Sequence, residues 1–128
     1  MAQAPVYLID DDGATLASTE FLLGALGVRA ISFSDPFAFL QDLASLEPGC
    51  ILTDLRMPSM SGLELHAALK KRRVGWPVIL MSGHSALESN SDAFNRGIVG
   101  MIEKPFTRAA LMKVLDRAFS ELSESETS

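Results

Sequence analysis

The sequence predicts an α/β fold in which a parallel β-sheet lies between two layers of helices, with five strands and five helices in alternation. Short apolar runs rich in valine, isoleucine and leucine recur along the 128 residues, which is typical of strands buried on both faces. Stretches of helical periodicity separate these runs, as in βαβ units. Polar residues close several of the runs, and parallel strands would bring them to one edge of the sheet.

The expected elements follow these patterns along the chain. Strands are expected near residues 5–9, 28–33, 50–54, 77–81 and 99–102. Helices are expected near residues 14–26, 36–46, 62–73, 86–96 and 108–120. The fold class that we expect from this alternation is a three-layer (βα)5, flavodoxin-like, doubly wound sheet with strand order 2-1-3-4-5. In that order the first and third strands are neighbours where the winding reverses, which is where such sheets bind ligands.

Local signals mark where two of the helices begin. Asp35 can cap a helix, and Pro36 suits the first helical position because its fixed φ is already helical. Ser61 and Glu64 have the spacing of a capping box, in which each side chain binds the backbone amide of the other residue. These signals predict helix starts close to residues 36 and 62.

The last two helices differ in the clarity of their periodicity. The final helix carries an apolar stripe at intervals of three and four residues, which can pack on a sheet. The stripe consists of Leu111, Leu115, Ala118 and Leu122. Segment 86–96 instead has Ser89, Asn90 and Ser91 where an inward face would be apolar, so we expect this fourth helix to be short, frayed or mobile.

Length and composition are those of one domain, expected over residues 1–120, followed by a polar, acidic tail or the start of a linker over residues 121–128. The formal net charge of -5 argues against direct nucleic-acid binding. Cys50 is the only cysteine, so no intramolecular disulfide can form. The chain has no signal-peptide pattern and no apolar stretch long enough to span a bilayer, and we expect a cytoplasmic protein without membrane association.

Ionisable and hydroxyl side chains follow four of the predicted strands. Asp10 and Asp11 follow the first, Asp54 ends the third, Ser82 follows the fourth and Lys104 follows the fifth. Three clustered carboxylates repel one another by an amount comparable with the net stability of a domain, about 5–15 kcal/mol, so they must take up protons or a cation. A carboxylate cluster without histidine or thiolate favours Mg²⁺, and Mn²⁺ could take its place.

A magnesium site of this kind predicts a phosphoryl ligand, because Mg²⁺ commonly binds one or two carboxylates together with phosphate oxygens. Lys104 would neutralise charge on those oxygens, and the hydroxyl of Ser82 could donate a hydrogen bond to one of them. A carboxylate beside the metal could act as a nucleophile. Asp54 is the best-placed nucleophile because it stands alone at the end of a central strand.

The motifs that contain these residues resemble those of response-regulator receiver domains of two-component signalling, over nearly the whole chain. They are Asp10-Asp11, Leu52-Thr53-Asp54-Leu55-Arg56-Met57-Pro58 with Ser61-Gly62, Met81-Ser82-Gly83-His84 and Glu103-Lys104-Pro105-Phe106. The similarity is to the FixJ/NarL type, in which a receiver often precedes a helix-turn-helix output domain. It therefore implies a signalling switch rather than a metabolic enzyme, with a DNA-binding domain outside this chain and homodimerisation on activation.

The resemblance also implies roles for individual residues. Asp54 would accept the phosphoryl group from the phosphohistidine of a sensor histidine kinase or a phosphotransfer protein. Asp11, Asp54 and the backbone carbonyl of Arg56 would bind Mg²⁺, with Asp10 acting through water. Self-phosphorylation from a phosphodonor and slow autodephosphorylation would be the only catalysis.

The same resemblance makes Ser82 and Lys104 the residues that bind the phosphoryl oxygens and report their presence. It also implies a cis peptide bond between Lys104 and Pro105, an isomer that is uncommon in proteins. Receivers usually carry tyrosine or phenylalanine three residues before the lysine, and Met101 stands there in this chain. Met101 is therefore a candidate switch residue that departs from the usual aromatic relay.

Two other functions stay open at this point. Residues 9–15, Ile9-Asp10-Asp11-Asp12-Gly13-Ala14-Thr15, approximate the DxDGT motif of magnesium-dependent phosphohydrolases of the haloacid-dehalogenase type. In that function Ala14 interrupts the motif, no acidic pair follows Lys104, and Asp54 has no role. The other alternative is a receiver-shaped interaction module that works without phosphorylation, which Met101 and the polar segment 86–96 favour.

Overall fold

The structure is a computed structural model that describes residues 4–83 and 98–127, with side chains described as far as residue 123. Five strands form one sheet in the order β2-β1-β3-β4-β5, and each neighbouring pair is parallel. The strands are β1 (Val6–Ile9), β2 (Ala30–Phe33), β3 (Cys50–Asp54), β4 (Val78–Ser82) and β5 (Ile98–Glu103). The predicted fold class and strand order are confirmed.

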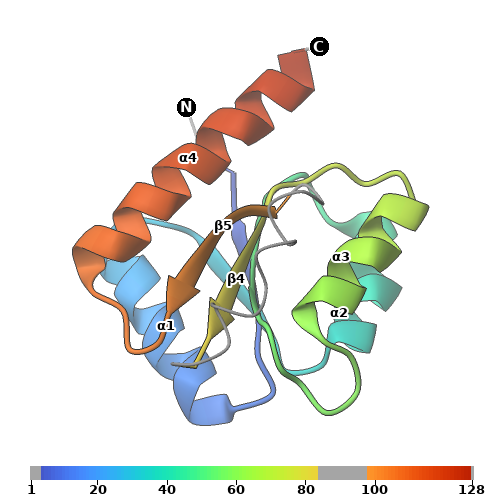
Figure 1. Cartoon of the computed structure of the whole chain (residues 1–128). Coiled ribbons are helices and arrows are strands. Elements are labelled where there is room, and N and C mark those ends of the chain that lie inside the picture. Colours follow the sequence, from blue (N-terminus) through green and yellow to red (C-terminus); the bar gives the residue numbers. More distant parts are fainter. Residues whose placement is uncertain (1–3, 84–97, 128) are drawn as a thin grey trace.

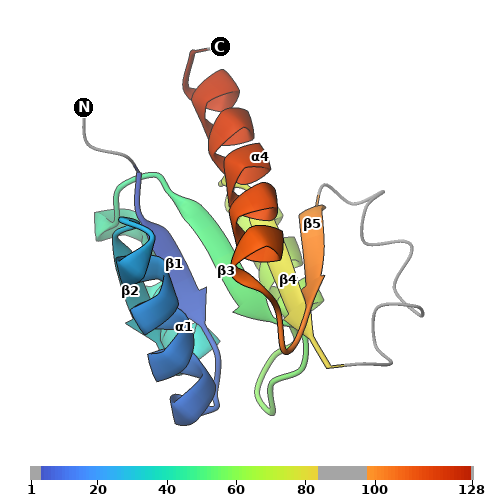
Figure 2. The ribbon, with the colours of Figure 1, turned by 90° about the vertical axis from the view of Figure 1, so that its left-hand side faces the viewer.

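Helices cover both faces of this sheet, so the domain has three layers (Figure 1). The helices are α1 (Gly13–Ala25), α2 (Pro36–Asp42), α3 (Gly62–Lys71) and α4 (Arg108–Thr127), with a short 3-10 helix η1 (Leu43–Ser45) after α2. Helices α1 and α4 lie on one face, and α2 and α3 lie on the other. In the view turned by 90°, α1 and α4 both lie in front of the sheet (Figure 2). No helix of the described residues is long and apolar enough to cross a membrane.

Successive residues of the central strands pack on opposite faces of the sheet. In β1, Val6 and Leu8 belong to the core beneath α1 and α4, whereas Tyr7 and Ile9 belong to the core beneath α2 and α3. All four are fully buried. This is why the strands appear in the sequence as continuous apolar runs rather than as an alternation of apolar and polar residues. Cys50 is also buried, and burial raises the pKa of its thiol to about 12.

The cap signals read from the sequence are confirmed. The side chain of Asp35 accepts a hydrogen bond of 3.0 Å from the backbone amide of Phe37, and Pro36 begins α2. Ser61 and Glu64 form the reciprocal capping box of α3, with distances of 3.0 and 2.9 Å. Each cap satisfies backbone amides that have no partner within the helix.

Several observed bounds differ from the predicted ones by two to four residues. The helix predicted for 36–46 ends at Asp42 and continues as η1, the strand predicted for 28–33 begins at Ala30, and the helix predicted for 62–73 ends at Lys71. The chain reverses direction there, with Arg73 in the left-handed region at a φ of 60°. The helix predicted for 86–96 lies outside the described residues.

The final helix is longer than its predicted range of 108–120. It continues to Thr127, because Leu122 extends the apolar stripe and is buried against the sheet with 3% exposure. Serine and glutamate content alone had indicated that the helix stops earlier. The division of the chain into a receiver over 1–120 and a tail or linker over 121–128 stays a prediction.

Gly49 allows β1 and β3 to approach each other closely where β3 begins. A Cβ atom at this position would lie 2.5 Å from the carbonyl oxygen of Pro5 and 2.8 Å from the ring of Tyr7. We expect Gly49→Ala to lower the free energy of unfolding by about 1–3 kcal/mol, because the backbone must shift to accept the methyl group. Urea unfolding measures this loss.

Gly24 gives the matched control, because a Cβ there meets nothing within 4 Å and the residue lies in α1. We expect Gly24→Ala to raise the free energy of unfolding by up to about 1 kcal/mol through helix propensity. Equal effects of the two substitutions would contradict the close approach at Gly49.

Candidate functional site

The ends of β1 and β3 bring three carboxylates together. β1 and β3 are neighbours in parallel register, so Asp10, which follows β1, lies beside Asp54 at the end of β3. Asp10, Asp11 and Asp54 each place a carboxylate oxygen within 4.8 Å of the other two. Asp10 is fully buried, Asp54 is half-buried and Asp11 is exposed. The sequence predicts these three acids at one edge of the sheet, and the structure places them there.

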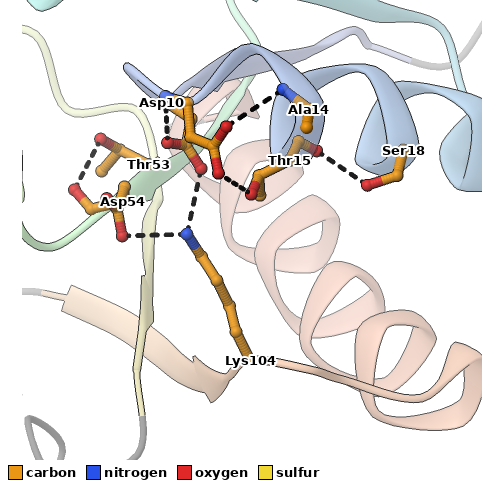
Figure 3. Close-up of polar contacts among 8 residues, drawn as sticks. Asp10, Ala14, Thr15, Ser18, Thr53, Asp54 and Lys104 are labelled. Atoms are coloured by element: carbon orange, nitrogen blue, oxygen red, sulfur yellow. Dashed lines mark hydrogen bonds and ion pairs between the residues drawn. The ribbon is translucent and has the colours of Figure 1, made fainter.

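Lys104 lies between two of these acids (Figure 3). Its Nζ atom is 3.1 Å from Oδ2 of Asp10 and 3.2 Å from Oδ1 of Asp54. The backbone amide of Lys104 donates to the carbonyl of Ser82 at 2.8 Å, which joins the ends of β5 and β4. The peptide bond between Lys104 and Pro105 is cis, as the resemblance implied.

Burial and the neighbouring charges shift the pKa values of both Asp54 and Lys104. Burial raises the pKa of the Asp54 carboxyl, and so does repulsion from Asp10 and Asp11, while Lys104 opposes the shift. Burial lowers the pKa of Lys104, but its hydrogen bond to Asp10 and its attraction to Asp54 outweigh burial and raise the pKa overall. Lys104 is therefore a cation, and one cation among three acids leaves negative charge that a metal ion could neutralise.

The residues present fit a small divalent cation. The cluster offers three carboxylate oxygens within 4.8 Å of one another, and no histidine or cysteine belongs to that cluster. Hard oxygen ligands of this kind, with positions left for water, are those that Mg²⁺ prefers. Arg56 is exposed in the loop after Asp54, and its backbone carbonyl is a further candidate ligand.

Ser82 ends β4 at the same edge of the sheet. The preceding residue, Met81, pairs with Asp54 across the two strands. Ser82 is 1% exposed, and its hydroxyl has no hydrogen-bond partner among the described residues. An unpartnered buried hydroxyl is unfavourable and is available to an incoming acceptor.

Met101 lies within β5, where it pairs with Leu80, and not at the acidic edge. It is half-buried and packs against the core beneath α2 and α3. It also lines a cavity of about 330 Å³ beside α4. The candidate switch residue is thus in contact with both the core and the surface of the domain. His84, which follows Ser82 and Gly83, lies outside the described residues.

Asp12 and Thr15 contact the site, although no role in it was predicted from the sequence. The backbone amide of Asp12 donates to Oδ1 of Asp10 at 3.0 Å. The hydroxyl of Thr15 donates to Oδ2 of Asp12 at 2.8 Å. The only signal in the sequence was that Asp12 suits a helix cap, which says nothing of a bond to Asp10.

The charge of Asp54 is expected to destabilise the domain when no metal is bound. A carboxyl whose pKa is raised by folding favours the folded state most below its unfolded value, near 3.8, and that advantage is lost as the pH rises through the raised pKa. Asp54→Asn removes this dependence, so we expect it to raise the free energy of unfolding by about 1 kcal/mol at neutral pH. Urea unfolding as a function of pH measures the effect.

The gain from Asp54→Asn is expected to shrink as the pH falls and when Mg²⁺ is added to the wild type. Asp42→Asn is the control, because Asp42 is exposed and its side chain makes no capping bond. If Asp54→Asn were less stable than the wild type at neutral pH without Mg²⁺, the repulsion of Asp54 by Asp10 and Asp11 would be contradicted.

Comparisons with known proteins agree with this geometry. Residues 6–116 match the family model of the response regulator receiver domain. The chain is 35% identical over 116 residues to the transcriptional regulatory protein FixJ of Bradyrhizobium diazoefficiens, covering 91% of this chain and 57% of that protein. It is 38% identical over 120 residues to FixJ of Azorhizobium caulinodans, covering 94% of this chain and 57% of that protein.

The crystal structure titled FixJ-N has the same fold. Its TM-score to this chain is 0.87 at 32% sequence identity, and the match covers 94% of this chain and 96% of that one. The chain spans little more than half the length of the curated relatives that it matches. On both sequence and structure, this chain belongs to the receiver-domain family of two-component response regulators.

Proposed function

We propose that this domain accepts a phosphoryl group on Asp54 in the presence of Mg²⁺ and thereby changes its affinity for a partner. The observation that carries this proposal is the position of Lys104, whose ammonium contacts both Asp54 and the buried Asp10 at 3.2 and 3.1 Å. A fixed cation beside a carboxylate nucleophile is what stabilises the charge of a transferred phosphoryl group.

Burial and hydrogen bonding distinguish Asp54 from Asp10 as the nucleophile. The side chain of Asp10 is 1% exposed, and both of its oxygens accept hydrogen bonds, from Asp12 and from Lys104. The side chain of Asp54 is 14% exposed, so it can meet a phosphodonor that approaches from solvent. Asp10 is instead suited to hold Lys104 and to influence the metal through water.

In the proposed reaction an oxygen of Asp54 attacks phosphorus in line with the leaving group. With a phosphohistidine donor, the P–N bond breaks as the O–P bond to Asp54 forms, and the imidazole nitrogen takes a proton. Lys104 binds one phosphoryl oxygen, and the unpartnered hydroxyl of Ser82 donates to another. Mg²⁺, when bound, supplies further charge neutralisation; Asp11, Asp54 and the backbone carbonyl of Arg56 would hold it, and Asp10 through water.

The donor and the output follow from the family and from the names of the relatives. We propose a sensor histidine kinase or a phosphotransfer protein as the donor. Because the FixJ relatives are transcriptional regulatory proteins and are longer than this chain, we propose that the domain acts in the cytoplasm on a DNA-binding output domain and does not contact DNA itself. Ser82 and Met101 would transmit the change, and the phosphorylated form would dimerise.

Intact mass spectrometry after incubation with Mg²⁺ and acetyl phosphate tests the proposal. We expect one phosphoryl adduct on the wild type and none on Asp54→Asn. Multiple turnover of phosphate esters that is lost in Asp10→Asn but kept in Asp54→Asn would support a phosphohydrolase instead. A correctly folded wild type that takes up no phosphoryl group would support an interaction module that works without phosphate.

A further inference from the structure

The turn between β1 and α1 carries two of the three clustered acids, Asp10 and Asp11. The next residue, Asp12, fixes the shape of this turn. The backbone amide of Asp12 donates to Oδ1 of Asp10 at 3.0 Å. The other oxygen of Asp10 accepts from Lys104 at 3.1 Å. The fully buried carboxylate of Asp10 is therefore held from two sides, and one of the two donors depends on where the backbone of Asp12 points.

The side chain of Asp12 in turn fixes its own backbone. Its Oδ1 accepts from the amide of Ala14 at 3.1 Å, and its Oδ2 accepts from the hydroxyl of Thr15 at 2.8 Å. Its carbonyl accepts the first helical hydrogen bond of α1, from Leu16 at 3.0 Å. Figure 3 shows Ala14 and Thr15 on the first turn of α1. Both carboxylate oxygens of Asp12 are thus used to tie the turn to the helix.

We propose that Asp12 is a positioning residue of the metal site: its cap on α1 holds the β1–α1 turn so that Asp10 and Asp11 face Asp54. This inference rests on the proposed function, because the arrangement matters only if the three acids share a metal ion. The link runs from Thr15 to Asp12, through the backbone amide of Asp12 to Asp10, and then to Lys104 and Asp54.

Removal of the Asp12 carboxylate is therefore expected to weaken Mg²⁺ binding by more than the loss of folding stability would explain. Without its carboxylate, residue 12 no longer holds its backbone amide toward Asp10, and the turn that carries Asp11 can rotate. Residues that orient metal ligands change metal affinity by about 10-fold to 100-fold when they are removed. Removal of a cap that has no connection to the site is expected to lower the free energy of unfolding and to leave the Mg²⁺ affinity unchanged.

Asp35 provides the matched control for Asp12. Both are aspartates in extended backbone that cap a helix and accept a hydrogen bond from the amide two residues later. The cap of Asp35 binds Phe37 of α2 at 3.0 Å, and Asp35 is not one of the three clustered acids. Substitution of either aspartate by alanine removes a comparable cap.

The experiment measures the dissociation constant of Mg²⁺ by titration calorimetry, and the urea midpoint, for the whole chain and its variants. We expect Asp12→Ala and Asp35→Ala to lower the urea midpoint by similar amounts. We expect Asp12→Ala alone to weaken Mg²⁺ binding, by about 10-fold or more. Asp12→Asn should largely restore binding, because asparagine also caps helices and its NH₂ group can pair with Thr15.

Thr15→Val gives a milder test that keeps the shape of the side chain, in case Asp12→Ala does not fold. It removes only the hydroxyl donor to Asp12, so we expect weaker Mg²⁺ binding than in the wild type and stronger binding than in Asp12→Ala. If Thr15→Val and Asp12→Ala both bind Mg²⁺ like the wild type, the inference is wrong while the proposed function stands.

Three further results would overturn the inference. Asp12→Asn that binds as weakly as Asp12→Ala would mean that the charge of Asp12 acts on the ion directly, without the cap. Asp35→Ala that loses as much Mg²⁺ affinity as Asp12→Ala would mean that general destabilisation explains the loss. A wild type that binds no Mg²⁺ would contradict the metal site of the proposed function itself, and the positioning role with it.

Discussion

Lys104→Met is expected to slow phosphorylation of Asp54 by acetyl phosphate about 10²-fold to 10³-fold, as when an enzyme loses one fixed donor to a developing charge. Methionine keeps most of the length and the apolar stem of lysine but carries no charge. The ammonium of Lys104 contacts Asp10 and Asp54 at once, so it is in place before the phosphodonor arrives. The rate of adduct formation, followed by intact mass at fixed Mg²⁺, measures the effect.

Lys113→Met is the control for this substitution. Lys113 is exposed on α4 and lines the cavity beside Met101 rather than the acidic cluster. We expect its rate of phosphorylation to equal that of the wild type. A Lys104→Met variant that is folded and phosphorylated at the wild-type rate would show that the cation next to Asp54 has no part in the transfer.

Phe39→Ala is expected to lower the free energy of unfolding by about 3–5 kcal/mol, a large share of the stability of a domain of this size. Phe39 is a residue of α2 and is fully buried. Its ring lies 5.6 Å from that of Tyr7 and 5.3 Å from that of Phe33, measured between centroids. Alanine would leave a cavity at the centre of this aromatic cluster, which neighbouring strands cannot close.

Phe21→Ala serves as the matched control, because the ring of Phe21 is 77% exposed on α1. We expect a change within about 0.5 kcal/mol for this variant. Urea unfolding followed by circular dichroism measures both. A loss below about 1 kcal/mol for Phe39→Ala would mean that the aromatic cluster does not stabilise the packing of α2 on the sheet.

The strands could be predicted because they depend on patterns that repeat along the chain, and their order was expected from the flavodoxin-like fold class. Val6 to Ile9 and Cys50 to Thr53 are buried on both faces, and this burial favours nearly continuous apolar runs whatever the details of packing. The cap at Asp35 and the capping box at Ser61 could be predicted because each uses contacts within four residues. Local interactions of this kind leave a signature in the local sequence.

Other features could not be predicted in the same way. Helix α4 was expected to end near residue 120 because the sequence after that point is rich in serine and glutamate, although Leu122 belongs to the apolar stripe and is buried in the structure. The bond from the amide of Asp12 to Asp10 spans only two residues, but aspartate at this place in the sequence suits a turn or a helix cap equally well, so the sequence does not say which carboxylate accepts the bond. The unpartnered hydroxyl of Ser82 follows from the packing of β4 among its neighbours.

The positions of the acids at one edge could be inferred from topology, but their individual burial could not. Asp10 and Asp11 are adjacent in sequence, yet Asp10 is fully buried and Asp11 is exposed. That difference arises because successive residues at the end of a strand point in different directions. It separates Asp10, which is buried and contacts Lys104, from Asp11, whose side chain is open to solvent.

The most direct test of the account is to locate the phosphoryl group within the chain. The wild type is phosphorylated with acetyl phosphate and Mg²⁺, the acyl phosphate is reduced with borohydride, and the modified residue is identified by tandem mass spectrometry. The account predicts reduction of Asp54 to homoserine, with Asp10 and Asp11 unchanged. Homoserine at position 10 or 11, or no modified aspartate in a protein that carries the adduct mass, would contradict it.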